Sequence, residues 1–395
     1  MRRVLAHAYE RTPLWLDPPL QAVRRYALPL LRADHPLRQL VGTGCDGRPA
    51  RVLLAGDGTA LDIAALARRF FTSAPEETAL GTVSGSALCH RLAALSAEHD
   101  LVLARTWNRY VGQAAQAGLL TMPDLPEMRL AVGTAQSALA AASSETRRIA
   151  RRCDDEGFGL HLTEGGDRFE EFYHGYYLPF VRNRHGIGLV ASAAPALRRR
   201  LRRGGITWTV LDGEPLFAVA YEVLDGTFRE LVAGTPQGRV DPVIQRARAA
   251  SRAGHIRLAT ERGLRWLNMG GCRPWLSDGM FASKGAWGGE LVPRADDLRS
   301  LLVGWRHWTP AVARLLAEHP LLLRAPDGFA AITVARHGHV LVGRRLAGVG
   351  ALHVVARAGL TTIARAPGVE SREVAFDGEP SSERVAVILG GRTGG

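Results

Sequence analysis

The segment 267–290, LNMGGCRPWLSDGMFASKGAWGGE, combines many glycines with side chains that can take part in a reaction. Glycine lets the backbone form irregular turns and approach a ligand closely. Between the glycines lie the guanidinium of Arg273, the carboxylate of Asp278 and the ammonium of Lys284. A fixed ammonium stabilises negative charge that develops on an oxygen in a transition state. These residue types therefore predict a site for a reaction that passes through an oxyanion.

Lys284 is also the only lysine of the chain, because 49 of the 50 basic residues are arginine. So strong a bias indicates a general pressure that replaces lysine wherever arginine serves equally well. A compact ammonium and a planar guanidinium are not interchangeable at sites that need one or the other. The surviving lysine is therefore a candidate for a site that needs an ammonium. The alternative is accidental survival of one lysine.

The elements that position this segment begin with three expected strands. The runs 206–211, 215–223 and 227–233 are apolar and are separated by Asp-Gly pairs, a strong hairpin signal. Asp241 and Pro242 then predict the start of a helix that runs to residue 262 and stops at Gly263. A strand over 264–269 follows. The pattern predicts an antiparallel meander, a helix and a further strand.

Two helices are expected before the meander. The first begins near Ser144 and ends at Gly157, and its arginines form either a solvated face or an anion-binding ridge. The second spans 169–181 and carries an aromatic stripe that predicts a core face. The hydroxyls of two stripe members, Tyr173 and Tyr177, could instead face a ligand. The arginines are Arg147, Arg148, Arg151 and Arg152, and the stripe is Phe169, Phe172, Tyr173, Tyr176, Tyr177 and Phe180.

Three stretches of this region resemble a known family. They are SETRR at the start of the helix from 144 to 157, FEEFYHGYYLPFVRNRHG at 169–186, and DGMFASKGAWGGE at 278–290 after the helix–Gly–strand unit. Their order is similar to that of the Fem-type (FemABX) aminoacyl transferases and of related bacterial acetyltransferase domains of the GNAT superfamily. The resemblance implies an α/β (α+β) fold with a GNAT-type mixed sheet flanked by helices.

What the resemblance implies for function is transfer of an acyl group to an amine. The donor would be acyl-CoA, such as acetyl-CoA, or an aminoacyl-tRNA, and no cofactor would be bound. Lys284 matches the lysine at the catalytic centre of the family, where it would stabilise the oxyanion. The sequence departs from the family at Ser283, where an aromatic residue is usual. An acceptor-stacking role for that position is therefore in doubt.

The other candidate catalytic residues are two carboxylates. Glu222, on the central strand of the meander, is either the general base or a carboxylate on a solvated strand face. Asp278 either orients the amine or caps the turn that Gly279 completes. The candidates for substrate binding are Arg273, Phe281, Trp287, Gly288, Gly289, Tyr173 and Tyr177, and those for donor binding are Arg239, Asp241, Arg147 and Arg151.

The net charge of +12 and the pI near 10.4 favour anionic partners such as tRNA or a nucleotide-bearing donor. The segment 235–240 fits a pyrophosphate-binding loop poorly, which favours an aminoacyl-tRNA donor or a divergent CoA site. The amine acceptor could be a small molecule, a cell-wall precursor, a polysaccharide or an antibiotic intermediate. The alternative from another class is a catalytically inactive, basic RNA-binding protein.

Neither the thirteen histidines nor the four cysteines show metal-ligand spacing, so no metal site is expected. No membrane span or signal peptide is expected either, which predicts a cytoplasmic protein. The chain is expected to divide into an α/β domain at 1–140, itself a degenerate GNAT-like candidate, an acyltransferase domain at 141–320 and a β-rich appendage at 321–395. Amphipathic helices are expected at 296–308 and 310–318.

Overall fold

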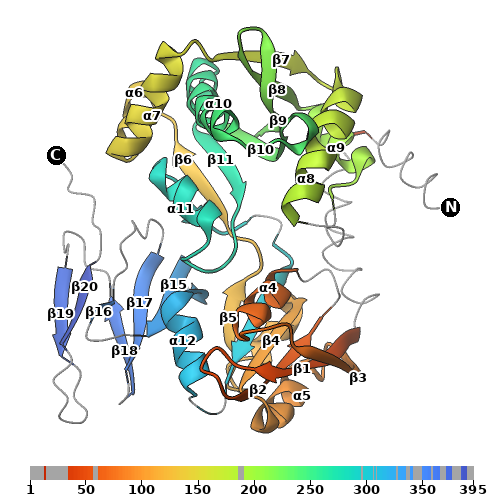
Figure 1. Cartoon of the computed structure of the whole chain (residues 1–395), viewed down its shortest axis with the longest axis vertical. Coiled ribbons are helices and arrows are strands. Elements are labelled where there is room, and N and C mark those ends of the chain that lie inside the picture. Colours follow the sequence, from red (N-terminus) through yellow and green to blue (C-terminus); the bar gives the residue numbers. More distant parts are fainter. Residues whose placement is uncertain are drawn as a thin grey trace. The chain divides into compact units, whose positions relative to one another are not determined.

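The computed structural model describes a large part of the chain (Figure 1). The described residues are 13–14, 34–56, 61–185, 191–294, 297–305, 307, 309–325, 328–334, 339–340, 349–356, 359–364, 371–375 and 384–388. The chain forms two units, whose boundaries do not coincide with those expected near residues 140 and 320. The first unit comprises Met1–Pro19, Met128–Gly270 and Lys284–Glu290, and the second Leu20–Glu127, Gly271–Ser283 and Leu291–Gly395.

A seven-stranded sheet organises the first unit, in the order β12-β6-β11-β10-β9-β8-β7. Strands β7 to β10 are antiparallel neighbours, whereas β10 and β11 are parallel. The sheet is therefore mixed, as expected, and the predicted meander is confirmed. The strands are β6 (Glu127–Ala131), β7 (Gly159–Glu164), β8 (Gly204–Leu211), β9 (Glu214–Leu224), β10 (Thr227–Gly234), β11 (Trp266–Gly271) and β12 (Glu290–Val292).

The two hairpin turns of the meander have the chemistry that their Asp-Gly pairs predict. Asp212 and Gly213 have φ angles of 52° and 80°, and Asp225 and Gly226 have 52° and 67°. Turns with both central residues in the left-handed region match the twist of antiparallel strands. The local sequence therefore determines where β8 ends and β9 begins, and where β9 ends and β10 begins.

Helix α10 (Pro242–Glu261) makes the crossover from β10 to β11. Its N-cap is Asp241, whose Oδ1 accepts a hydrogen bond of 2.9 Å from the amide of Ile244. Gly263, with a φ of 63°, follows its C-terminal end. Both predicted helix boundaries are confirmed. The helix packs on β8 and β9, where Ile244 and Ala247 share a core with Phe217.

The aromatic stripe covers the other face of this sheet. It lies on a π-helical segment, η4 (Glu171–Tyr177), and on α8 (Leu178–His185), next to α9 (Ala194–Leu201). Trp208 of β8 is fully buried and meets Phe172 and Tyr176 edge-on, with ring centroids 6.4 and 5.2 Å away. The prediction of a core face is confirmed. With α10 on one face and α8 and α9 on the other, helices flank the mixed sheet as predicted.

Helix α7 (Ser144–Asp155) begins where expected, but its cap is one residue earlier than predicted. The hydroxyl of Ser143 accepts a hydrogen bond of 3.2 Å from the amide of Thr146. The preceding helix, α6 (Ala135–Ala140), is capped by Thr134. A serine pair offers two equivalent hydroxyls, so the choice depends on which backbone remains extended.

A six-stranded sheet forms the centre of the second unit, in the order β3-β1-β2-β4-β13-β5. Helices α4 (Leu61–Arg69), α5 (Leu88–Leu95) and α12 (Pro310–Glu318) belong to this unit, and the prediction of α12 is confirmed. The strands are β1 (Asp34–Thr43), β2 (Pro49–Ala55), β3 (Glu76–Ser84), β4 (Leu101–Trp107), β5 (Leu120–Pro123) and β13 (Arg299–Gly304).

The region after residue 320 is rich in strands, as predicted. Buried residues of β14 and β15, including Leu321 and Ile332, share a core with Leu54 of β2 and Phe70 beside α4. β14 and β15 are therefore joined to the preceding sheet by a shared core. Its strands are β14 (Leu321–Ala325), β15 (Gly328–Val334), β16 (His339–Val340), β17 (Val349–Ala356), β18 (Gly359–Ala364), β19 (Ser371–Ala375) and β20 (Arg384–Ile388).

The prediction of a helix over 296–308 is wrong. Residues 299–304 form β13, an antiparallel neighbour of both β4 and β5. Ser300, Leu301, Leu302 and Val303 are all at most 1% exposed, because a central strand is covered on both faces. A short apolar run of this kind cannot be distinguished from a buried helix by periodicity alone.

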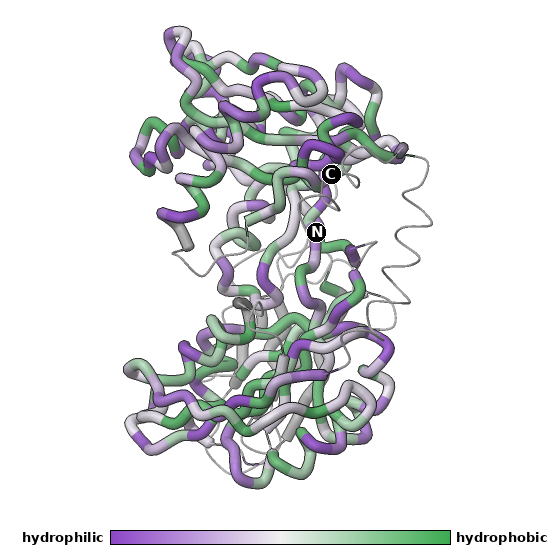
Figure 2. Tube along the Cα trace, turned by 90° about the vertical axis from the view of Figure 1, so that its right-hand side faces the viewer, coloured by the Kyte–Doolittle hydropathy of each residue, from purple (hydrophilic) through white to green (hydrophobic). Residues whose placement is uncertain are grey.

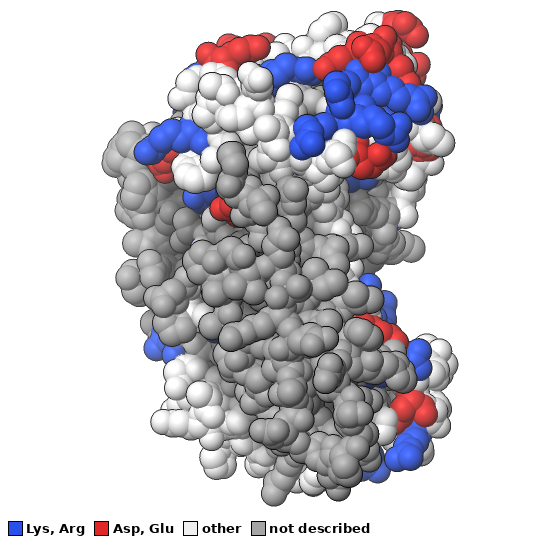
Figure 3. All heavy atoms as spheres, turned by 90° about the vertical axis from the view of Figure 1, so that its left-hand side faces the viewer, with Lys and Arg blue, Asp and Glu red and all other residues white. Residues whose placement is uncertain are grey.

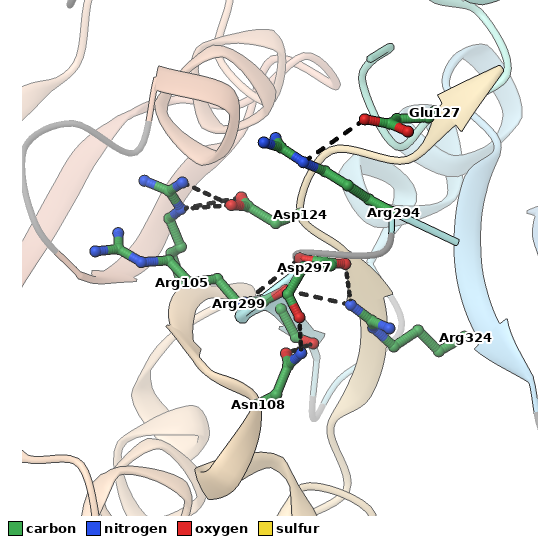
Figure 4. A network of polar contacts seen from close by, with 9 residues as sticks. Arg105, Asn108, Asp124, Glu127, Arg294, Asp297, Arg299 and Arg324 are labelled. Atoms are coloured by element: carbon green, nitrogen blue, oxygen red, sulfur yellow. Dashed lines mark hydrogen bonds and ion pairs between the residues drawn. The ribbon is translucent and has the colours of Figure 1, made fainter. Parts of the chain in front are cut away.

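Ion pairs and hydrogen bonds surround the start of β13 (Figure 4). Arg105 donates two bonds of 2.9 and 2.6 Å to the carboxylate oxygens of Asp124. The carboxylate of Asp297 pairs with Arg324. The backbone carbonyl of Asp297 accepts a hydrogen bond of 2.7 Å from the side-chain amide of Asn108. Burial raises the pKa of Asp297; Arg324 opposes this rise, and the nearby Asp124 adds to it. These contacts anchor the chain before the central strand.

Among the described residues, no helix is long and apolar enough to cross a membrane. Figure 2 shows hydrophobic and hydrophilic residues alternating along the chain in both units.

Candidate functional site

Lys284 lies in the last turn of α11 (Gly279–Ala286) and is almost completely buried, with 3% of its surface exposed. Its Nζ donates a hydrogen bond of 2.9 Å to the carbonyl oxygen of Gly270 at the end of β11. An ammonium has three N–H bonds, of which Gly270 accepts one. The only lysine of the chain is therefore held in the interior of the first unit rather than in solvent.

The ammonium lies near the point where the ladder between β10 and β11 ends. The two strands pair over three residues each, Thr227–Arg229 with Trp266–Asn268. Glu230 follows directly, and the pairing of β10 with β9 shifts register between Glu230 and Val232. The end of a parallel ladder leaves backbone groups that side chains can reach. Lys284 uses one of them.

Gly270 makes this approach possible. It has a φ of 76°, in the region that side chains other than glycine rarely adopt. A Cβ at this position would lie 3.8 Å from Nζ of Lys284 and 3.5 Å from the carbonyl oxygen of Glu230. The backbone of Glu230 and the ammonium of Lys284 thus both lie close to this glycine.

Glu230, whose backbone lies beside Gly270, carries a carboxylate that is 11% exposed. Its Oε2 lies 2.8 Å from Nη2 of Arg252, and its Oε1 lies 2.7 Å from Nδ1 of His255. Burial alone would raise the pKa of this carboxyl, but Arg252, His255 and then Lys284 outweigh it and bring the pKa down to about 2. Glu230 is therefore ionised at neutral pH.

This depressed pKa makes a prediction about stability. A folded pKa of about 2, below the ordinary value of 4.5, means that the contribution is complete above pH 4.5 and disappears as the pH falls towards 2. The contribution is on the order of 3 kcal/mol in the free energy of unfolding. Urea unfolding of the wild type and of Glu230→Gln at several pH values measures it. The gap between the two proteins should narrow between pH 4.5 and 2, and a constant gap would contradict the assignment.

A chain of hydrogen bonds continues from Glu230 through the sheet. The carboxylate can only accept, so Nδ1 of His255 carries a proton. Nε2 of His255 lies 2.8 Å from the hydroxyl of Thr207 and 3.4 Å from that of Ser251. His255 and Thr207 are fully buried. The imidazole is thus fixed between β8 and Glu230.

Glu230, Arg252 and His255 are not among the residues predicted from the sequence. A weak signal exists, because Ser251 and Arg252 lie four and three residues before His255 on one predicted helix, so each of them neighbours His255 on the helix surface. The periodicity does not show which strand residue this face meets. That pairing depends on the register of β9, β10 and α10.

Glu222, the predicted general base, lies on the face of the sheet opposite to that of Glu230. It pairs across the hairpin with Arg229, whereas Glu230 pairs with Tyr221. Neighbouring residues of a strand point to opposite faces, so Glu222 does not share the face of Glu230. Glu222 is 2% exposed and lies 2.6 Å from Nη2 of Arg200. The alternative of a solvated carboxylate is therefore wrong, since the residue is buried in an ion pair.

Asp278 makes the contacts of a helix cap. Its Oδ1 accepts hydrogen bonds of 3.0 and 3.1 Å from the amides of Met280 and Phe281. The side chain is buried, with 8% of the residue exposed. Of the two predicted roles, the geometry supports the capping role, and no described contact bears on an amine substrate.

A substitution separates these roles. Asp278→Ala is expected to lower the free energy of unfolding by about 1 kcal/mol, because two amides of α11 lose their acceptor. Asp278→Asn keeps a capping oxygen and should retain most of the stability. Chemical denaturation of the two variants gives the comparison. Equal losses in both would show that the negative charge, rather than the cap, matters.

The predicted substrate-binding residues are mostly buried. The hydroxyl of Tyr173 donates a hydrogen bond of 3.0 Å to the carbonyl oxygen of Ser192. The hydroxyl of Tyr177 accepts one of 2.8 Å from the backbone amide of Ser192. Phe281 and Trp287 are 2% and 7% exposed. Arg273 lies over the ring of Trp275, with its Cζ 5.6 Å from the centroid. These side chains are therefore engaged in contacts within the protein.

Gly288 and Gly289 shape the chain after Lys284. Gly288 has a φ of 84°, and a Cβ there would lie 2.8 Å from Cβ of Ala141 and 2.9 Å from its carbonyl oxygen. The amide of Gly289 donates a hydrogen bond of 3.1 Å to the carbonyl of Lys284. A Cβ added at Gly289 would overlap the side chain of Met269. These glycines bring the end of α11 against its neighbours.

Three of the four predicted donor-binding residues have partners within the protein. Arg239 pairs with Asp241 at 3.1 Å and with Glu214 at 3.4 Å. Arg147 donates to the carbonyls of Ala140 and Ala142 at the end of α6. Arg151 is exposed on α7.

Other arginines of α7 and α10 lie next to acidic residues. Arg148 pairs with Glu145, and Arg152 and Arg246 both pair with Glu156. Figure 3 shows arginines beside acidic side chains on one face of the first unit. The basic face of α7 is therefore interleaved with carboxylates.

Within the described residues, no group of three or more His, Cys, Asp and Glu side chains could hold a metal ion.

No protein-family model matches the chain, and no curated protein matches it. Solved structures do match at low identity. L-PGS from Bacillus licheniformis is 13% identical, with 70% of this chain and 87% of that one covered and a TM-score of 0.34. FemX is 11% identical; the match covers 71% of this chain and 90% of FemX, with a TM-score of 0.37. A GCN5-related N-acetyltransferase from Kribbella flavida is 12% identical, with 74% and 97% covered and a TM-score of 0.27.

These matches include the Fem-type and GNAT proteins that the sequence resembles. All three TM-scores lie below 0.5, so the functional conclusion has to come from the residues of this chain.

Proposed function

We propose that this protein is an N-acyltransferase in which Lys284 stabilises the oxyanion. The supporting observation is that the only lysine is buried, with its Nζ 2.9 Å from the carbonyl of Gly270 where the ladder of β10 and β11 ends. A positive charge in an interior acts with less screening than one in water. Such a charge lowers the energy of a transition state that develops negative charge nearby.

In the proposed reaction the amine nitrogen attacks the acyl carbonyl carbon and forms the C–N bond. The carbonyl oxygen becomes negatively charged, and the ammonium of Lys284 stabilises it. Collapse of the intermediate breaks the bond to the donor, C–S for acyl-CoA or C–O for an aminoacyl-tRNA. The amine proton is taken up by the departing thiolate or alkoxide, which leaves as a thiol or a hydroxyl, or by water.

Neither Glu230 nor Glu222 suits the role of general base. Glu230 has a pKa of about 2 and is too weak a base to take a proton from an ammonium acceptor. Glu222 lies on the other face of the sheet in an ion pair with Arg200. We therefore propose that the acceptor reacts as the free amine, and that the rate rises with pH as the acceptor loses its proton.

Transfer from each donor class tests the proposal. The protein would be incubated with radiolabelled acetyl-CoA or aminoacyl-tRNA and with amine acceptors drawn from aminosugars, cell-wall precursors and amine-bearing antibiotics. Label in an amide product that persists after ribonuclease treatment of the protein identifies acyl-CoA as donor. Label that requires intact tRNA identifies the aminoacyl-tRNA donor, which the net charge of +12 favours. Transfer from neither donor, with salt-dependent RNA binding, would support the inactive RNA-binding alternative.

A further inference from the structure

A serine and a histidine of the second unit lie within hydrogen-bonding distance of each other. Oγ of Ser277 is 2.6 Å from Nδ1 of His319. Ser277 is exposed, and His319, partly buried, follows the C-terminal end of α12. A hydroxyl in such a contact can pass its proton to the imidazole as it attacks an electrophile. The pair therefore contains the nucleophile and the base that covalent catalysis by serine requires.

The backbone on both sides fixes this pair. Trp275 and Leu321 form an antiparallel bridge, and both residues are fully buried. Two backbone hydrogen bonds, of 2.8 and 2.9 Å, join the two segments beside the bridge. Ser277 and His319 lie opposite each other two positions from the bridge, so their side chains leave the same face. The contact between them thus rests on a buried anchor.

Arg69, at the C-terminal end of α4, lies against the imidazole. Its Nη1 is 3.2 Å from Nδ1 and 3.0 Å from Nε2 of His319. Because these distances are nearly equal, the guanidinium contacts the ring as a whole rather than the lone pair of one nitrogen. Burial and then Arg69 lower the pKa of His319, and Glu318 of α12 opposes them. The imidazole is therefore neutral at neutral pH and can accept the proton of Ser277.

The surroundings of the hydroxyl leave room for a substrate. Ser277 is exposed, and a Cβ added at Gly279 would meet no other part of the protein within 4 Å. Among the described residues, no carboxylate is hydrogen-bonded to the imidazole, and Glu318 bonds instead to Arg314 at 2.8 Å. A catalytic histidine without a carboxylate partner makes a much slower catalyst. The pair therefore suits acyl groups with a good leaving group, rather than amides.

We propose that Ser277 is a nucleophile that accepts an acyl group from an activated ester or thioester, with His319 as its general base. Oγ attacks the carbonyl carbon and forms a C–O bond, while Nδ1 of His319 takes the hydroxyl proton. The bond to the leaving group then breaks, and the departing thiolate or alkoxide takes this proton and leaves as a thiol or an alcohol. Water attacks the acyl-serine with the same base, which releases the acid and restores Ser277.

Arg69 acts on this reaction through the imidazole. Its positive charge disfavours the imidazolium that forms when the proton leaves Ser277, which favours return of the proton to the leaving group. The site lies within the second unit and does not involve Lys284. It therefore stands or falls independently of the amine acylation proposed above.

Reaction of the full-length protein with p-nitrophenyl acetate tests the proposal. We expect nitrophenol release that depends on Ser277, and an acetyl group on the peptide that contains this residue, detected by mass spectrometry after acid quenching. Ser277→Ala should lose both signals. His319→Gln should be acylated about 10²–10⁴-fold more slowly, because the general base is lost.

The pH profile of acylation gives a readout that a purely structural role would not move. The rate should fall as the pH drops below the pKa of His319, because the protonated imidazole cannot accept a proton. Since Arg69 lowers this pKa and Glu318 raises it, Arg69→Gln should move the midpoint to higher pH and Glu318→Gln to lower pH. These two variants thus shift the profile in opposite directions.

Ser283→Ala is the matched control, because it removes another exposed serine of the same segment. It should be acetylated like the wild type. The proposal is overturned if Ser277→Ala releases nitrophenol at the wild-type rate, or if Arg69→Gln leaves the midpoint unchanged or lowers it. Circular dichroism verifies folding, and if His319→Gln does not fold, Ser277→Ala and Arg69→Gln decide the question. Transfer to amines should persist in Ser277→Ala, so the two proposals fail separately.

Discussion

Lys284→Arg is expected to lower the rate of acyl transfer by about 10²–10³-fold, the usual effect of removing one oxyanion donor. A guanidinium keeps the charge but spreads it over a planar fork that is longer than the ammonium. The position allows little adjustment, because Lys284 is 3% exposed and its Nζ bonds to the carbonyl of Gly270. Single-turnover transfer with a saturating donor measures this loss.

Folding should survive the loss of the ammonium. In Lys284→Met, which removes the charge but retains an unbranched chain, Glu230 still has Arg252 and His255 as partners. We therefore expect both variants to fold and both to lose transfer. A silent Lys284→Arg would contradict the proposed role. If Lys284→Arg alone failed to fold, the transfer rate of Lys284→Met would still decide the matter.

Gly288→Ala is expected to lower the free energy of unfolding by roughly 2–5 kcal/mol and to reduce transfer as well. A side chain in the left-handed region costs about 1–2 kcal/mol, and overpacking adds about 1–3 kcal/mol. Both apply here, since φ is 84° and the added Cβ would lie 2.8 Å from Cβ of Ala141. Denaturant unfolding and the transfer assay measure the two effects.

Gly285→Ala is the matched control, three residues earlier on α11. Its Cβ would meet only Cε of Met128, at an ordinary contact distance of 3.9 Å. Replacing a helical glycine with alanine gains about 0.5–1 kcal/mol, so this variant should be as stable as the wild type or more stable. Similar losses in both variants would mean that the backbone conformation of Gly288 is not the cause.

The meander and the crossover helix could be predicted because their signals are local. The Asp-Gly pairs at 212–213 and 225–226 adopt the left-handed turns that these residue types favour, and Asp241 caps the helix that Pro242 begins. The helix predicted over 296–308 failed for the opposite reason. Residues 300–303 are buried because β4 and β5 flank the strand within the sheet, and because two different cores cover its faces, one around Leu301 and Val303 and the other around Leu302. These neighbours are distant in sequence.

The sequence by itself shows that the chain has one lysine and 49 arginines, and that this lysine follows a glycine-rich turn after a predicted helix and strand. The tertiary structure alone decided which strand carboxylate meets helix α10. Glu222 and Glu230 are both strand residues, and only the hairpin register places them on opposite faces. His255 joins Glu230 across 25 positions of sequence and Thr207 across 48. The conformation of a turn depends on residues that are neighbours in sequence. The partners of a strand side chain depend instead on which distant elements pack against that face of the sheet.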